Sequence, residues 1–339
     1  MLQLLKDLCS IPGPSGAEDR VRAEILRRIQ DHCETRVDPL GNIIAFKKGE
    51  KTPKNKVMFA AHMDEVGFII THIEESGLLG FSRIGGIDAR VILGKRLLVG
   101  DALVAGVIGA KPLHLLKGDE EEAVPNPDSL YIDIGARTRE EAERHVLPGD
   151  FATFDSQYVE FGGGLVKARA LDDRAGCTIM IEMISSGLEY DTWFAFNVQE
   201  EVGCRGAVAS AYTIDPDYAV VLEATTAADI AGVEEDKQVC RLGGGPVLSF
   251  MDRSTVYDRE LYRLGHEVAK KNGIPSQPKS LVAGGNESGV IHKSRGGVRT
   301  LSVSLPCRYL HSPSCVIQKD DLFSTLSLAK AVAAELAAR

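Results

Sequence analysis

The stretch Val57-Met58-Phe59-Ala60-Ala61-His62-Met63-Asp64 joins an uninterrupted apolar run to two side chains that can take part in metal binding. A short run of this kind is typical of a strand buried on both faces, as in a sheet flanked by helices. Comparable runs occur at residues 193–196, 218–222 and 300–305. Helical patterns lie at 175–185, 260–272 and 319–338. This alternation predicts an α/β fold with helices on both faces of a sheet.

Residues 67–163 depart from this pattern. Short segments of Val, Ile and Leu are separated there by glycines, and no long helix is apparent. We therefore predict a small β domain, barrel-like, inserted into an α/β domain made of residues 1–66 and 164–339. The alternative is an extended β excursion of one and the same domain. Near the N-terminus, Ser15 and Glu18 have the spacing of a helix capping box.

Composition excludes several classes of protein. The 339 residues carry a formal net charge of −9, which argues against a duplex nucleic-acid binder. No apolar stretch approaches the roughly 20 residues of a helical membrane span, and the first residues lack the pattern of a signal peptide. We therefore expect a cytoplasmic protein without membrane partners. The seven cysteines include no CxxC pair, so we interpret them as buried reduced thiols.

Polar side chains that can bind metal follow the predicted strands directly. They are His62 and Asp64 after the first run, Glu200 and Glu201 after the second, Glu223 after the third and His311 after the fourth, with Asp172 and Asp173 just before a predicted helix. In open α/β sheets, ligands bind beyond the carboxyl ends of the strands. Adjacent glutamates usually lie on a solvated face, but a pair on an apolar β run is expected to meet a cation.

The residue types at this edge indicate the metal. Two imidazoles with several carboxylates and no thiolate fit zinc, cobalt or manganese. Three carboxylate ligands leave room for two metal ions that share one of them. Such pairs polarise a carbonyl group and lower the pKa of bound water. One of the adjacent glutamates can then bind metal while the other accepts the proton of that water.

Four segments carry a resemblance to a known family. In chain order, AHMDEVGF (61–68), ALDDRAG (170–176), NVQEEVGCRGA (197–207) and RYLHSP (308–313) resemble the motif series of the tetrahedral (TET-type) dinuclear-metal aminopeptidases. That family includes glutamyl aminopeptidases and members labelled endoglucanases. The resemblance covers essentially the whole chain. It implies a helix-flanked mixed sheet of the zinc-exopeptidase type with the β insertion serving oligomerisation or substrate access.

The resemblance also implies roles for individual residues. Asp172 resembles the bridging ligand, His62 and Glu223 would hold one metal, Glu201 and His311 would hold the other, Glu200 resembles the general base and acid, and Asp64 would orient His62. Two positions depart from the family. Position 223 is usually Asp, and the family's Gly-Gly-Thr-Asp segment reads Gly284-Gly285-Asn286-Glu287 here. Asn286 and Glu287 are accordingly our candidates for substrate binding.

The expected function is removal of N-terminal residues from short peptides by metal-hydroxide attack on the first peptide carbonyl. The expected cofactors are two divalent ions per subunit, zinc or cobalt, with manganese as a further option. The resemblance implies a hollow dodecamer built from dimers. Three alternatives stay open: a deacylase or carboxypeptidase on the same scaffold, a glycosidase, and a non-catalytic metal or peptide binder. A glycosidase would leave His62 and His311 without a task.

Overall fold

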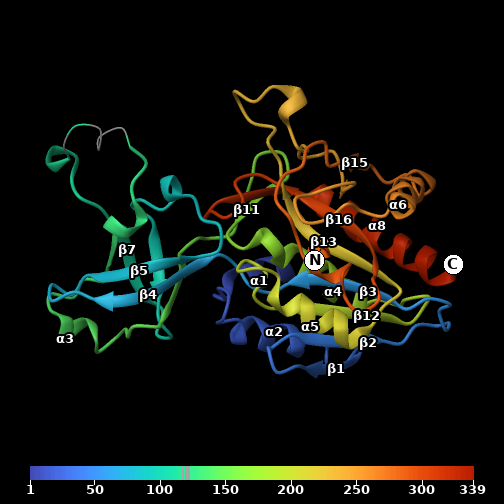
Figure 1. The fold of residues 1–339 in the computed structure, drawn as a ribbon, viewed down its shortest axis with the longest axis horizontal. Helices are drawn as coiled ribbons and strands as arrows, with labels where there is room; N and C mark the ends of the chain where they lie inside the picture. Colours follow the sequence, from blue (N-terminus) through green and yellow to red (C-terminus); the bar gives the residue numbers. More distant parts are fainter. Residues whose placement is uncertain (117, 119–122) are drawn as a thin grey trace.

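The fold is built on an eight-stranded mixed sheet, seen here in a computed structural model that describes residues 1–116, 118 and 123–339 (Figure 1). The strands lie in the order β1 (Glu34–Val37), β2 (Ile43–Lys47), β12 (Thr192–Asn197), β3 (Val57–His62), β13 (Tyr218–Thr226), β16 (Arg299–Cys307), β14 (Val247–Leu248) and β15 (Gln277–Pro278). The four from β12 to β16 are parallel to one another, whereas β2 and β14 join them in antiparallel pairs. The predicted apolar runs all lie in this parallel group.

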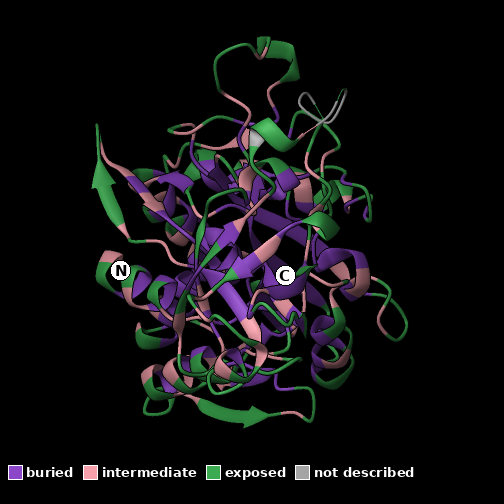
Figure 2. Cartoon of the chain, turned by 90° about the vertical axis from the view of Figure 1, so that its left-hand side faces the viewer, coloured by how far each residue is buried: buried purple, intermediate pink, exposed green. Residues whose placement is uncertain are grey.

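Helices cover both faces of the sheet, because successive side chains of a strand point to opposite sides. Phe59 and Ala61 of β3 face a core that also takes residues from α1 (Leu2–Ser10), α2 (Asp19–Ile29), α4 (Leu171–Ser185), α6 (Arg259–Lys271) and α8 (Lys319–Ala338). Met58 and Ala60 face a second core with α5 (Arg205–Ile214) and α7 (Ser288–Ile291). Figure 2 shows these buried residues gathered in the middle of the molecule. The predicted α/β class is confirmed.

The predicted insertion contains a closed β-barrel that lies beside the sheet, on the left in Figure 1. Its strands follow the order β4 (Gly67–Ile73), β5 (Leu79–Ile84), β8 (Tyr131–Asp133), β7 (Val104–Gly109), β6 (Arg96–Val99) and β9 (Phe151–Phe154), with α3 (Arg139–Ala142) nearby. The barrel has a hydrophobic core of its own. Within it, Phe68 packs edge-on against Phe81 and Phe154, at centroid distances of 5.3 and 5.2 Å. The barrel-like expectation is confirmed.

A small sheet joins the insertion to the rest of the chain. It has the order β10 (Val159–Phe161), β11 (Leu165–Ala168) and β17 (Cys315–Gln318), all antiparallel. Strand β10 thus belongs to the predicted insertion, while both of its sheet partners belong to the predicted α/β domain. The division into residues 1–66 plus 164–339 and 67–163 stays a prediction.

In the part of the chain that the structure describes, short 3-10 helices also occur at Ala89–Val91, Leu113–Leu115, Pro127–Ser129 and Glu235–Lys237. None of the helices in the described part of the chain combines the length and apolar character that crossing a bilayer requires. Helix α4 begins irregularly, since Asp172 and Asp173 have non-helical dihedral angles. The two acidic residues at its start therefore lie in an irregular segment, and the regular helix follows them.

Candidate metal centre

The side chains predicted to bind metal meet at the carboxyl edge of the parallel strands. His62 is the last residue of β3, Glu223 lies near the end of β13, and Glu201 follows β12. His311 comes from the loop between β16 and β17, and Asp172 comes from the start of α4. Parallel pairing brings these strand ends together, as the sequence predicted.

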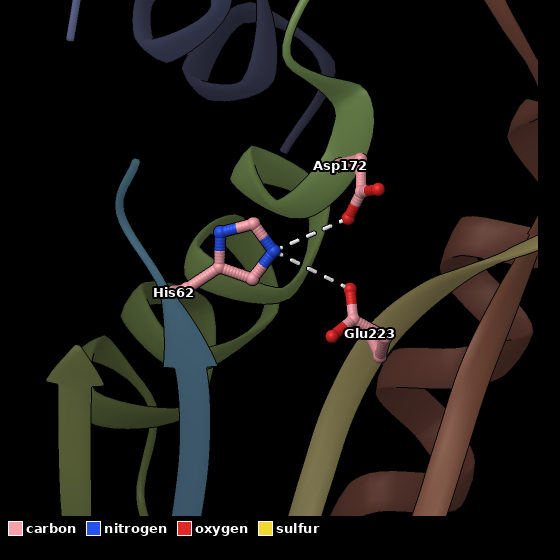
Figure 3. Close-up of side chains that lie close together, drawn as sticks. All are labelled: His62, Asp172 and Glu223. Carbon is pink, nitrogen blue, oxygen red and sulfur yellow. Dashed lines mark hydrogen bonds and ion pairs between the residues drawn. The ribbon is translucent and has the colours of Figure 1, made fainter. Parts of the chain in front are cut away.

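His62, Asp172 and Glu223 form the first group of candidate ligands (Figure 3). The Nε2 atom of His62 lies 3.2 Å from Asp172 Oδ1 and 3.5 Å from Glu223 Oε1. All three residues are buried, and their ligand atoms lie within 4.8 Å of one another. The Glu223 side chain, departing from the Asp expected at this position, thus reaches the other two candidate ligands.

Asp172, Glu201 and His311 form the second group. His311 Nε2 lies 3.4 Å from Asp172 Oδ2 and 3.2 Å from Glu201 Oε2. On the other side of the ring, His311 Nδ1 lies 3.1 Å from the carbonyl oxygen of Gly86, a residue of the predicted insertion. This contact fixes the ring so that Nε2 faces the carboxylates.

Asp172 is common to both groups and faces each with a different oxygen. Its Oδ1 points to His62 and its Oδ2 points to His311. In the described part of the chain, no Lys or Arg forms an ion pair with Asp172, Glu201 or Glu223. Buried carboxylates without such partners carry a large desolvation cost. The donor set thus fits divalent cations.

The electrostatics of the cluster agree with this interpretation. Burial raises the pKa of Glu201 and of Glu223 well above the ordinary value, and the neighbouring Asp172 charge raises both further. For Asp172, burial opposes ionisation, but hydrogen bonds to His311 and His62 outweigh it and lower the pKa. Carboxylates crowded in this way repel one another, and a cation among them relieves the repulsion.

Asp64 contacts one residue of each ligand group, His62 and Glu201. It is fully buried, its Oδ1 lies 3.4 Å from His62 Nδ1, and its backbone carbonyl oxygen lies 3.1 Å from the same nitrogen. Its two oxygens also accept hydrogen bonds from the backbone N–H groups of Glu200 and Glu201, at 3.0 and 3.1 Å. The predicted contact with His62 is present. The two backbone contacts were not predicted, since no sequence signal relates them to Asp64.

Ser15 takes part in the same arrangement. Its hydroxyl donates to Asp64 Oδ2 at 2.6 Å. Helix α2 is preceded by Glu18 without any side-chain capping bond, so the predicted capping box of Ser15 and Glu18 is wrong. The Glu18 carboxylate instead accepts from the N–H groups of Gly16 and Gln199. Ser15 and Glu18 therefore bind other groups, and the contacts to Asp64 and Gln199 are too distant in sequence for a local pattern to reveal.

Glu200 lies outside both ligand groups and lines a cavity of about 700 Å³. Burial raises its pKa, and its Oε1 accepts a hydrogen bond from the Cys204 thiol at 3.2 Å. Such an environment favours a carboxylate that takes up and releases a proton. The predicted pairing of one ligating and one free glutamate is therefore compatible with the geometry.

The two predicted substrate-binding residues are placed differently. Asn286 lines the cavity, whereas Glu287 is fully buried and does not line it. Glu287 accepts a hydrogen bond from Asn197 Nδ2 at 2.9 Å, and burial raises its pKa to about 8. Lys279 also lines the cavity. Sequence reasoning did not single it out, because nothing in its local sequence distinguishes it from a surface lysine.

Comparisons with known proteins give a consistent result. The pattern of the M42 glutamyl aminopeptidase family matches residues 41–328. A putative aminopeptidase of Acetivibrio thermocellus is 38% identical, with 97% of each chain covered. The lysyl aminopeptidase of Pyrococcus furiosus is 34% identical over 98% of this chain and 97% of that protein.

Solved structures are similar as well. Aminopeptidase APDkam598 from the archaeon Desulfurococcus kamchatkensis superposes with a TM-score of 0.92 at 36% identity, covering 97% of this chain and 93% of that one. The TET1 peptidase of Pyrococcus horikoshii, which can assemble into a tetrahedron or a large octahedral shell, gives 0.87 at 38% identity with 98% of each chain covered.

Proposed function

Since this chain belongs to the M42 glutamyl aminopeptidase family and is a metal-dependent aminopeptidase, we propose that it holds two divalent ions and removes N-terminal residues from short peptides. The observation that carries this proposal is the position of Asp172. Its two oxygens face two separate groups of donors, each completed by one histidine and one glutamate. A carboxylate in that position is suited to bridge two ions.

The proposed ligands are His62, Asp172 and Glu223 for one ion, and Asp172, Glu201 and His311 for the other. When bound there, zinc, cobalt or manganese supplies Lewis acidity, which polarises the peptide carbonyl and makes a bound water more acidic. His62 and His311 are each fixed by a contact on Nδ1, so that Nε2 is free to face the ions. These contacts within the protein thus orient both imidazole rings toward the proposed ion positions.

Glu200 is the proposed general base and acid. It lines the cavity beside the ligand groups, and the bond from its backbone N–H to Asp64 fixes its position. Its carboxylate accepts the proton of the attacking water and passes it to the leaving amine. A carboxylate in this position can act in both halves of the transfer, first as the base and then as the acid.

The cavity suits the end of a peptide chain. Carboxylates of the proposed centre line it, and so do Asp88 and Arg90 of the predicted insertion. The insertion therefore contributes both to the cavity and, through the Gly86 carbonyl, to the position of His311. This arrangement supports an exopeptidase that admits short peptides and excludes folded chains.

We further propose a homo-oligomer of the tetrahedral, dodecameric type, because the similar TET1 peptidase can assemble into a tetrahedron. Sedimentation or light scattering checks this directly, and a monomer in solution would contradict it. A cytoplasmic location stays a prediction.

The decisive experiment strips the enzyme with a chelator and restores Zn²⁺, Co²⁺ or Mn²⁺ singly. Hydrolysis of aminoacyl p-nitroanilides should disappear and return, while N-acetylated versions and N-acylated amino acids stay uncleaved. Cleavage of the N-acyl substrates instead would favour the deacylase alternative. Activity indifferent to chelation would refute the metal-dependent mechanism.

A further inference from the structure

Lys279 is a buried cation in the wall of the proposed catalytic cavity. It follows strand β15 directly, it is 5% exposed, and it lines the same cavity as Glu200 and Glu223. Among the residues that the structure describes, no carboxylate lies within ion-pair distance of its ammonium group and none accepts a hydrogen bond from it. Its ammonium nitrogen is not among the fully enclosed polar atoms, so it opens to the cavity and is available to a negatively charged group bound there.

The nearby acids are already engaged. Asp252 is the first of them, and its Oδ1 accepts from Ser254 N–H and Thr255 N–H, both at 2.8 Å. Its Oδ2 accepts from the Tyr257 hydroxyl at 2.6 Å. Glu223 is the second, and it belongs to the first ligand group. Both acids favour the charged lysine through space, although burial lowers its pKa. Neither supplies the missing contact.

The other cations that line the cavity are less suited to bind a substrate carboxylate. Arg90 is exposed and is bound by the carboxylate of Asp88 from its own loop. Lys95 is exposed, so water already solvates its ammonium group. Among the described residues that line this cavity, Lys279 is therefore the one cationic side chain that is buried. Asn286 and Thr225 line the same space and offer amide and hydroxyl donors beside it.

We propose that Lys279 is a specificity-determining residue, which receives the side-chain carboxylate of an N-terminal glutamate or aspartate of the substrate. This inference rests on the proposed function and names its preferred substrate. It does not follow from the comparisons, because the family is named for glutamyl cleavage while a relative 34% identical to this chain is a lysyl aminopeptidase. The juxtaposition of one unpaired, buried ammonium with the proposed reaction centre favours the acidic class.

The test compares Glu-, Asp-, Gln-, Leu- and Lys-p-nitroanilide with the metal-loaded, full-length enzyme. We expect kcat/KM for the Glu substrate to exceed that for Gln by at least tenfold. Lys279→Met should lower kcat/KM for Glu and Asp by about ten- to a hundredfold, the range expected for one charge-assisted hydrogen bond. The Gln and Leu values should stay within about threefold, which also shows that the variant folds. Lys271→Met, an exposed lysine of α6 with the same charge change, is the matched control.

These outcomes separate the competing explanations. A wild-type preference for Lys or Leu, or a Lys279→Met variant that loses all substrates equally, overturns the inference while leaving the aminopeptidase intact. A carboxylate could also come from the C-terminus of a dipeptide, which p-nitroanilides lack. Hydrolysis of the dipeptide Leu-Gly tests this second source. If Lys279→Met lowers kcat/KM for Leu-Gly but not for Glu-p-nitroanilide, Lys279 binds the C-terminal carboxylate and the inference is overturned. Failure to hydrolyse any substrate with any metal refutes the proposed function itself.

Discussion

At the scale of single residues, the division of work between Glu200 and Glu201 is the central feature. The two are adjacent in sequence and share Asp64 as the acceptor of their N–H groups. Only Glu201 approaches His311 and Asp172 to form a ligand group. Both residues lie in the turn after β12 and both line the cavity, so Glu201 can bind metal while Glu200 stays free to act on a bound water.

Glu200→Gln should therefore leave the metal content intact and lower kcat by roughly a hundred- to ten-thousandfold, the usual contribution of a general base. Elemental analysis of the purified variant and steady-state kinetics on one neutral p-nitroanilide measure the two quantities. Glu201→Gln is the matched control, and it should lose metal. A Glu200→Gln enzyme with near-normal kcat would exclude the proposed role.

Asp64→Asn should weaken metal binding by about ten- to a hundredfold, which is the usual effect of removing the acidic partner of a ligating histidine. The buried carboxylate accepts from Ser15 and from two backbone N–H groups, and it faces His62 Nδ1. Competition with a chromogenic chelator measures the affinity. Ser15→Ala removes only one of these bonds and should have a smaller effect. Equal effects of the two substitutions would show that Asp64 does not act through His62.

At the scale of elements, a buried ionic contact joins the barrel to the sheet domain. Arg169, which follows β11, contacts the carboxylate of Glu65 and donates to the Thr153 hydroxyl of β9 at 2.9 Å. It also donates to the carbonyl of Ser10 at the end of α1. Arg169 and Glu65 are each only 3% exposed at the side chain. One guanidinium thus connects a helix, a barrel strand and the segment that leads into the barrel.

Arg169→Met should lower the free energy of unfolding by about 3 kcal/mol, because it leaves the buried Glu65 carboxylate with the Gly13 N–H and the more distant Arg174 guanidinium, at 3.8 Å. Urea unfolding followed by circular dichroism measures this change. Arg20→Met removes an exposed ion pair with Asp101 and should change the same quantity by less than about 1 kcal/mol. Similar losses in both variants would mean that burial of the Arg169 contact contributes little.

At the scale of the whole molecule, the metal centre lies where separate parts of the chain meet. Its proposed ligands come from three strand ends or the turns after them, from the start of α4 and from the β16–β17 loop, and the barrel loop contacts His311. Ions bound at such a point stabilise the folded state, because the unfolded chain does not hold these donors together.

Chelation should accordingly lower the thermal midpoint by several degrees, and Zn²⁺ or Co²⁺ should restore it. Differential scanning fluorimetry measures the shift. Glu200→Gln keeps all five ligands and should show the full shift, whereas His311→Ala lacks one ligand and should show a smaller one. An unchanged midpoint in the wild-type protein after complete metal removal would contradict the predicted coupling.

The α/β class, the barrel-like part and the set of clustered His and carboxylate side chains could all be predicted from the amino-acid sequence. These depend on local pattern, since a strand buried on both faces is uniformly apolar and the polar residues that end it stand out. The predicted capping box of Ser15 and Glu18 was wrong because it relied on local spacing alone. The Ser15 hydroxyl instead donates to Asp64, which is distant in sequence.

Three features could not be predicted without the folded arrangement. They are the oxygen of Asp172 that faces each histidine, the bond from Glu200 N–H to Asp64 across 136 residues, and the place of Lys279 in the lining of the same cavity. The physical reason is that these contacts depend on side-chain direction and strand order. Strand β15 ends at the sheet edge three positions from β13, so the relation between Lys279 and Glu223 exists only once the whole sheet is assembled.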